Sequence, residues 1–357
     1  MTAAAFESIP VVDVAHLAGG GPPPRALAEE LTTACHRVGF VLVVNHGVDD
    51  DLHSAVFEMM RRFFSLPEPS KRLIDKRASR HFRGWEPVGT EYTNNRPDIR
   101  EQIDCWSEWP ARSRDVEPDY LRLLGPNQWL PPDVLAGHEA LGNRWSVALG
   151  GVAARLLGAL WSGLGLPPDH LRRFIGDEPM SLTKFIHYPA TPPGAAGVNA
   201  HHDTGFLTIL STGETPGLQV QNPAGQWIDV PAVPGSLVVN LGESLQAMTG
   251  NYLVATPHRV ISTAQRYASG HFYGPSLEAS LDPLPLDARF AEAVAASAHH
   301  ANAGFMARRE ELQAGVGDMA SDYRPATYGE QLWNYFARSY PEIVDHHYGV
   351  ARAGARP

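Results

Sequence analysis

The chain has 357 residues, with 29 Lys and Arg against 39 Asp and Glu, a formal charge of −10. This length fits one large domain or two small ones, and the lack of basic runs argues against nucleic-acid binding through phosphate attraction. Cys35 and Cys105 lie far apart without metal-ligand spacing, as free thiols do in a reduced compartment. No secretory signal and no run of about 20 apolar residues are evident. The sequence therefore predicts a cytoplasmic protein without a membrane segment.

Short strands and helices alternate at the start of the chain. Residues 9–13 read as an opening strand, and a helix is predicted over 25–38, with Leu27 and Leu31 on its apolar side. A buried strand follows at 40–44, then a second helix over 50–64 that ends before Pro67. Residues 83–101 are rich in Gly, Pro, Asn and charged residues, which predicts a loop region.

A long helix is predicted from Pro131 to about residue 164. Apolar residues recur there every three or four positions, including Leu135, Trp145 and Leu156, and so form one face. His138 lies in this stripe and is expected to be a core histidine. We expect the helix to cover a sheet from outside.

From residue 180 to about 284 the pattern changes to short β-like runs separated by turn residues. Many short strands at close spacing indicate a sandwich or barrel, of which the double-sheet jelly roll is one form. After Pro285 the sequence pattern is again typical of helices, and a final helix is predicted from Tyr328. The predicted strands cover residues 181–188, 201–210, 217–221, 227–230, 236–240, 258–263 and 267–273.

The strongest candidate functional residues are His201 and Asp203. They lie two positions apart at the start of an apolar, β-branched run, so in a strand their side chains leave one face while His202 leaves the other. Two His and one carboxylate on one side of a metal leave the opposite side open, as in non-haem Fe(II) oxygenases. His258 is the candidate third ligand, and Arg266 begins another β-like run eight residues later.

This order of residues resembles the 2-oxoglutarate/Fe(II)-dependent dioxygenases of the isopenicillin N synthase-like group. Further likeness lies in Ile-Pro-x-x-Asp at 9–13, Gly-Phe at 39–40, Asn-His-Gly at 45–47 and Tyr-Pro at 188–189, so the resemblance covers nearly the whole chain. It implies a mixed α and β fold, with a double-stranded β-helix (jelly-roll) core flanked by helices. One catalytic unit would comprise an N-terminal region at 1–115, a helical brace at 116–178, the core at 179–285 and a C-terminal helical region at 286–357.

The resemblance also implies an enzyme that uses Fe(II), 2-oxoglutarate as co-substrate and O2. His201, Asp203 and His258 would bind the iron. Arg266 would hold the distal carboxylate of 2-oxoglutarate through a bidentate pair of charge-assisted hydrogen bonds, a geometry that Lys cannot reproduce.

One position departs from the family pattern. Many relatives carry Ser two residues after this Arg, whereas this chain has Ala268, and Ser269 should face away from the site. Relatives of the bacterial ethylene-forming type also resemble Arg-aromatic-Ala here. Tyr188 either supplies a replacement hydroxyl to the carboxylate or is a half-buried strand tyrosine. Residues 240–243 resemble a family turn near the site and are expected to be structural.

The expected reaction is hydroxylation, desaturation or cyclisation of a small polar metabolite, such as an amino acid or a natural-product intermediate of secondary metabolism, with release of succinate and CO2. Glu91 and Arg100 are candidate substrate contacts or else solvated surface residues. Two alternatives remain: a 2-oxoglutarate-independent oxidase of the isopenicillin N synthase or aminocyclopropane carboxylate oxidase kind, and a non-catalytic β-barrel binding protein. We expect a small-molecule partner, no nucleic acid and no membrane, and the oligomeric state stays open.

Overall fold

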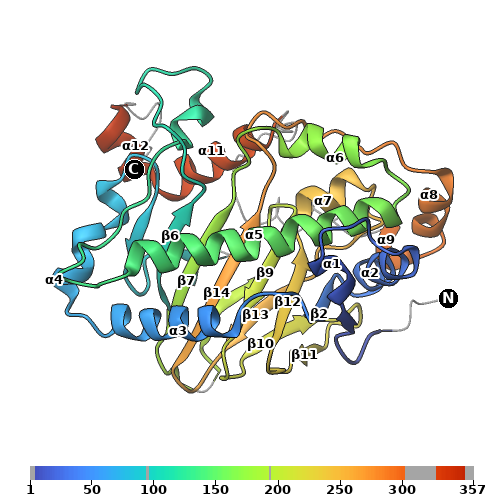
Figure 1. The fold of residues 1–357 in the computed structure, drawn as a ribbon, viewed down its shortest axis with the longest axis horizontal. Coiled ribbons are helices and arrows are strands. Elements are labelled where there is room, and N and C mark those ends of the chain that lie inside the picture. The colour runs from blue at the N-terminus through green and yellow to red at the C-terminus, as the bar shows by residue number, and fades with distance from the viewer. Residues whose placement is uncertain (1–4, 94–95, 193, 302–326, 350–357) are drawn as a thin grey trace.

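Two β-sheets form the centre of the molecule in the computed structural model, which describes residues 5–93, 96–192, 194–301 and 327–349 (Figure 1). The larger sheet is antiparallel except where its edge strand β1 pairs in parallel with β2. In spatial order it contains β1 (Val11–Asp13), β2 (Phe40–Val44), β12 (Ser236–Leu241), β9 (Leu207–Ser211), β14 (Arg266–Tyr273), β7 (Leu182–Tyr188), β6 (Glu101–Trp106) and β3 (Gly84–Glu86). The smaller sheet contains β11 (Trp227–Asp229), β10 (Leu218–Gln221), β13 (His258–Ile261) and β8 (Ala196–His201), and a separate hairpin joins β4 (Tyr92–Thr93) to β5 (Arg96–Pro97).

The two sheets enclose an apolar core, which confirms the predicted jelly roll. Ile186 and Ala268 of the larger sheet pack with Val198, Val220 and Val260 of the smaller one. Because alternate side chains of a strand leave opposite faces, every second residue of β7 and β14 points into this inter-sheet space. That alternation decides which polar residues can reach a site between the sheets.

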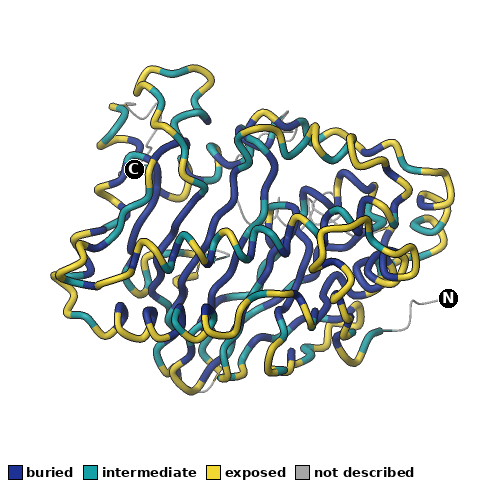
Figure 2. Tube along the Cα trace, viewed as in Figure 1, coloured by how far each residue is buried: buried dark blue, intermediate teal, exposed yellow. Residues whose placement is uncertain are grey.

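Helices cover the other face of the larger sheet. In Figure 1, α5 (His138–Gly163) runs across the strands with α3 (Asp50–Phe64) beside it. Figure 2 shows buried and exposed residues alternating along these helices. The helix begins at His138 rather than at Pro131, because Gly137 adopts a left-handed conformation with φ 80°. His138 is buried and accepts a hydrogen bond from the Leu130 amide, so the expected core histidine is confirmed. The layer comprises α2 (Arg25–Arg37), α3 (Asp50–Phe64) and α5 (His138–Gly163).

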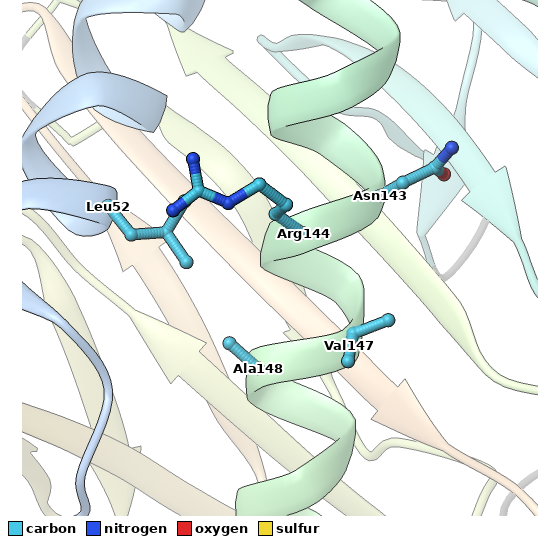
Figure 3. Close-up of a pocket in the computed structure, with 5 residues that line it drawn as sticks. All are labelled: Leu52, Asn143, Arg144, Val147 and Ala148. Atoms are coloured by element: carbon cyan, nitrogen blue, oxygen red, sulfur yellow. The ribbon is translucent and has the colours of Figure 1, made fainter.

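Among the described helices, α5 alone is long and apolar enough to cross a membrane. Core helices of globular proteins have the same composition, and here Trp145, Leu149 and Leu156 are almost wholly buried in the cluster under the sheet. A surface hollow lies between α5 and α3, on the far side of the sheet from the inter-sheet space (Figure 3). Its lining residues are Leu52, Asn143, Arg144, Val147 and Ala148.

The C-terminal helices close one end of the inter-sheet space. Phe336 and Tyr340 pack with Phe82, Trp106 and Leu182 in a second apolar cluster. The remaining elements are α1 (Ala15–Ala18), α4 (Glu68–Lys71), η1 (Arg72–Ile74), η2 (Lys76–Ala78), η3 (Asp119–Leu123), α6 (Pro168–Ile175), α7 (Glu243–Met248), α8 (Ala288–Ala295), α9 (Ala298–Ala301), α11 (Tyr328–Ser339) and α12 (Pro341–Tyr348).

The predicted strand at 201–210 is wrong as a continuous element. β8 ends at His201, and β9 begins at Leu207. Between them, the carbonyl oxygens of Asp203 and Thr204 accept hydrogen bonds from the first amides of α7 instead of from a neighbouring strand. The two segments meet closely at Gly242, where a Cβ atom would lie 2.1 Å from the Gly205 carbonyl oxygen.

β6 was not predicted, because its sequence does not look like that of a buried strand. The predicted loop ended at Glu101, where β6 begins, and all six of its residues are buried. Gln102 and Asp104 alternate with Ile103 and Cys105, so one face of the strand is polar although no face meets solvent. A polar, buried face of this kind indicates a site between the sheets rather than a surface.

Candidate metal centre and active site

His201, Asp203 and His258 meet at one end of the inter-sheet space. One possible ligand atom from each lies within 4.8 Å of the others. The Nε2 atoms of both imidazoles are 3.7 Å from Oδ1 of Asp203, and the two rings face each other across paired positions of β8 and β13. His202 is not a member of this cluster, as the alternation had predicted.

Backbone carbonyl groups orient both imidazoles. Nδ1 of His201 lies 2.9 Å from the Asn199 carbonyl oxygen, and Nδ1 of His258 lies 3.1 Å from that of Thr256. These contacts favour the tautomer that carries its proton on Nδ1, so the Nε2 lone pair of each ring is available to a metal.

The carboxylate of Asp203 is held in the same manner. Its Oδ2 atom accepts hydrogen bonds from the Thr208 hydroxyl at 2.6 Å and the Asn240 amide at 2.7 Å, so Oδ1 faces the two imidazoles. Residues 240–243 were expected to be structural, and the Asn240 side chain has the further task of holding the candidate ligand Asp203 in place.

The electrostatics of the cluster favour a metal ion. Burial lowers the pKa of His201 to about 3, with His258 acting in the same direction. Burial also disfavours ionised Asp203, but the two histidines and its two hydrogen-bond donors outweigh this and lower the pKa of the carboxyl. At neutral pH the cluster thus offers a neutral His201 and one carboxylate, with the second imidazole beside them. Two imidazoles and one carboxylate on one side suit Fe(II).

Arg266 lies in the same space and lacks an anion. Only 1% of the residue is exposed, and its Nε atom donates to the Thr215 carbonyl oxygen at 3.2 Å. Its Nη1 and Nη2 atoms are buried and have no hydrogen-bond partner in the described part of the chain. Burial lowers the pKa of this guanidinium. Since an unpaired buried cation is costly, the pocket fits a ligand carboxylate such as that of 2-oxoglutarate.

Comparison with known proteins decides the family. The model of the 2OG-Fe(II) oxygenase superfamily matches residues 178–275, which include the three clustered residues and Arg266, and the model described as non-haem dioxygenase in morphine synthesis N-terminal matches 9–132. The 2-oxoglutarate-dependent dioxygenase frbJ of a Dothideomycetidae species is 32% identical over 78% of this chain and 77% of its own length. The chain belongs to the 2-oxoglutarate-dependent dioxygenases.

Two further comparisons agree with this family. A homoarginine-6-hydroxylase of Arabidopsis thaliana is 28% identical over 79% of this chain and 89% of its own length. The fold is similar to that of a full-length Neurospora crassa protein solved in complex with alpha-KG, with a TM-score of 0.66, 24% identity and coverage of 78% of this chain and 88% of that one. Because the chain belongs to the 2-oxoglutarate-dependent dioxygenases and contains the cluster of two His and one Asp, its cofactors are Fe(II), 2-oxoglutarate and O2.

The region around Ala268 in the dioxygenase follows the predicted alternation. Ala268 is fully buried between the sheets, whereas Ser269 points to the outer helices, where it accepts a hydrogen bond from Trp145 and donates one to the Lys184 carbonyl oxygen. The Tyr188 ring lies 5.0 Å from the Arg266 guanidinium carbon, on the paired position of the adjacent strand. Tyr188 is buried rather than half-buried, and its role toward the carboxylate remains a prediction.

Glu91 and Arg100 are not solvated surface residues. Each side chain is 10% exposed, and the two form an ion pair with each other. Glu91 also pairs with Lys184 at 3.0 Å, and Arg100 with Asp98 at 3.3 Å. Their predicted contact with substrate stays a prediction. Because both side chains are largely buried, such a contact would be made inside the protein and not at its surface.

Sequence reasoning missed the groups that orient the metal ligands. Asn199 and Thr256 act through backbone carbonyl groups, which carry no side-chain signal. Thr208 lies in the motif stretch itself, but its contact with Asp203 depends on the turn between β8 and β9, where the sequence predicts a continuous strand.

Thr208→Val should weaken Fe(II) binding by about tenfold to a hundredfold, because it removes one donor from the Asp203 carboxylate at nearly constant shape. Thr208→Ser keeps the hydroxyl and should bind Fe(II) almost as tightly as the wild type. Anaerobic competition with a chromogenic chelator measures both affinities. Equal losses in the two variants would assign the effect to packing and not to the hydrogen bond.

Proposed function

We propose that this dioxygenase oxidises a small polar metabolite, an amino acid or a natural-product intermediate, by hydroxylation, desaturation or cyclisation. The observation that carries the proposal is the set of charged side chains buried on the inner side of the larger sheet, including Glu91, Arg100 and Lys184. An apolar substrate would gain nothing from such groups, and burying them costs free energy. The homoarginine-6-hydroxylase among the relatives supports a polar, amino-acid-like substrate.

The residues of the site have two tasks, which are to bind the metal and the co-substrate and to exclude water. When bound, Fe(II) and 2-oxoglutarate supply the oxidation of a C–H bond with O2, coupled to formation of succinate and CO2. His201, Asp203 and His258 would hold the metal from one side and leave the other side for ligands. Arg266 would orient the co-substrate through its distal carboxylate. Phe40, whose ring meets that of His258 edge-on, would shield this ligand from water.

The two alternatives from the sequence are disfavoured. A 2-oxoglutarate-independent oxidase could also use the Arg266 guanidinium, for a carboxylate of its own substrate, but the chain belongs to the 2-oxoglutarate-dependent dioxygenases. The unpartnered Nη1 and Nη2 atoms suit the distal carboxylate of that co-substrate. A non-catalytic binding protein would not need the oriented ligand set of His201, Asp203 and His258.

Coupled succinate release tests the proposal. The Fe(II) enzyme with 2-oxoglutarate is supplied with a panel of amino acids, polar natural-product precursors and apolar compounds of similar size. We expect at least one polar compound to raise succinate formation well above the substrate-free rate, and Asp203→Ala to abolish the increase. Stimulation by apolar compounds alone would overturn the proposed substrate class.

A further inference from the structure

The inner face of β6 carries a row of buried polar residues that the metal centre does not use. Gln102, Asp104 and Trp106 occupy alternate positions and therefore share one face. Ile103 and Cys105, between them, belong to the cluster under the outer helices, so the row faces the opposite way, toward the space between the sheets.

Seven charged side chains form a continuous layer around Asp104, which we call the β6 charge layer. Lys76 lies 2.7 Å from both Glu86 and Asp104, and Lys184 lies 3.7 Å from Asp104 and 3.0 Å from Glu91. The pairs of Arg100 with Glu91 and Asp98 complete it. Four carboxylates thus face three cations, which leaves a net charge of −1. The members are Lys76, Glu86, Glu91, Asp98, Arg100, Asp104 and Lys184.

Burial acts differently on the members of this layer. It raises the pKa of Asp98, although Arg100 opposes the shift. Burial disfavours the charged form of Glu91, but Arg100 and Lys184 outweigh it and the pKa of Glu91 is lowered. Burial likewise opposes the charge on Lys76, yet Asp104 and Glu86 raise the pKa of its ammonium group well above its ordinary value. Glu91 and Lys76 therefore both keep their charges, so protonation of Glu91 does not remove the excess negative charge of the layer.

Two acceptors in the layer have no hydrogen-bond donor, although Nζ of Lys184 lies 3.7 Å from one of them, Oδ1 of Asp104. The Oε1 atom of Gln102 and the Oδ1 atom of Asp104 are buried without a hydrogen-bond partner within the described residues. Their companion atoms are engaged, because Gln102 Nε2 donates to Glu86 at 3.2 Å and Asp104 Oδ2 pairs with Lys76. Each residue is only 1% exposed. Since buried acceptors are nearly always satisfied, this pair calls for a ligand that donates hydrogen bonds.

The layer is connected to the metal centre. Asp98 accepts hydrogen bonds from the backbone and side-chain N–H groups of Asn199 at 3.2 and 3.1 Å, and the Asn199 carbonyl oxygen orients His201. Along β7, Lys184 stands four residues before Tyr188, whose ring lies beside Arg266 in the site, and four residues span roughly 13 Å of strand. A ligand with a chain of several carbon atoms could therefore bind at the layer and present a C–H bond toward the metal.

We propose that the β6 charge layer binds a cationic nitrogen group of the primary substrate, a guanidinium, amidinium or ammonium, with Gln102 Oε1 and Asp104 Oδ1 as its acceptors. A cation that donates several hydrogen bonds satisfies both atoms and neutralises the net charge of the layer at the same time. A neutral donor would satisfy the atoms but leave the charge. This inference rests on the proposed function, because it names the substrate class of the same site.

Matched pairs of probes test the charge requirement directly. L-Arginine is compared with its neutral analogue L-citrulline, and L-lysine with L-norleucine, by anaerobic calorimetry on the Fe(II) enzyme with 2-oxoglutarate. We expect at least one cationic probe to bind at least tenfold tighter than its neutral partner. Equal affinities within both pairs, or no binding of either cationic probe at millimolar concentration, would overturn the inference.

Variants of the two acceptors locate the site. Asp104→Asn should reduce the preference for the cationic probe at least tenfold, and Gln102→Leu, which changes no charge, should weaken that probe severalfold. Asp229→Asn, on the exposed edge of β11, is the control and should change neither. If Asp104→Asn keeps the full preference for the cationic probe, the two acceptors are not its binding site. If Asp104→Asn does not fold, an unchanged affinity of Gln102→Leu for the cationic probe contradicts the assignment in the same way. Succinate release stimulated only by neutral polar compounds would refute the inference and leave the proposed function intact.

Discussion

Asp203→Ala should lose most Fe(II) binding and all substrate-coupled succinate release. Asp203 supplies the anionic ligand of the cluster, and its Oδ1 atom lies 3.7 Å from both imidazole Nε2 atoms. Without it, two imidazoles remain, which bind a divalent ion more weakly and leave a further position open. His201→Ala and His258→Ala remove one of three ligands each and should have the same effect. Metal analysis after anaerobic loading, together with succinate release, measures the losses.

His202→Ala is the matched control for these ligand variants. It removes an imidazole from the same motif, one position from either ligand, and His202 does not belong to the metal-binding cluster. We therefore expect one Fe(II) per chain in this variant, as in the wild type. Loss of iron in His202→Ala with retention in His201→Ala would show that the assigned ligands are wrong.

The metal ligands could be predicted because their signal is local. His201 and Asp203 are two residues apart, and His258 and Arg266 follow in a recognisable order. The predicted local geometry was still wrong, since β8 ends at His201 and the Asp203 carboxylate lies in the turn to β9. The side chains converge because the backbone around Asp203 is bound to the first turn of α7, a contact between segments distant in sequence.

β6 and its polar face could not be predicted for a different reason. Local pattern reasoning treats charged residues as exposed, and Asp104 is buried only because Lys76 and Lys184 reach it from other elements. The same holds for Glu91, which the sequence left between substrate contact and solvated surface. Such ion pairs depend on tertiary structure, so only a structure reveals which charged residues lie inside.

Arg266→Ala should weaken 2-oxoglutarate binding by about tenfold to a few hundredfold. A charge-assisted hydrogen bond contributes roughly 1.5–3 kcal/mol, an unpaired carboxylate in a dry pocket costs more, and each 1.4 kcal/mol is about a factor of ten. Iron affinity should change little, because Arg266 is not a ligand. Titration of 2-oxoglutarate into the anaerobic Fe(II) protein, followed by the metal-to-ligand absorption, measures the affinity.

Two further variants separate the charge of Arg266 from its geometry. Arg266→Lys should fall between wild type and Arg266→Ala, since it keeps the charge but loses the planar fork. Ala268→Ser restores a hydroxyl on the same strand face, two residues away, and should leave the affinity unchanged or tighten it. Wild-type affinity in Arg266→Ala would assign the carboxylate to another group. Tyr188, whose ring lies 5.0 Å from the guanidinium carbon, would then be the first residue to test, because its pairing with Arg266 across β7 and β14 places it at the same end of the inter-sheet space.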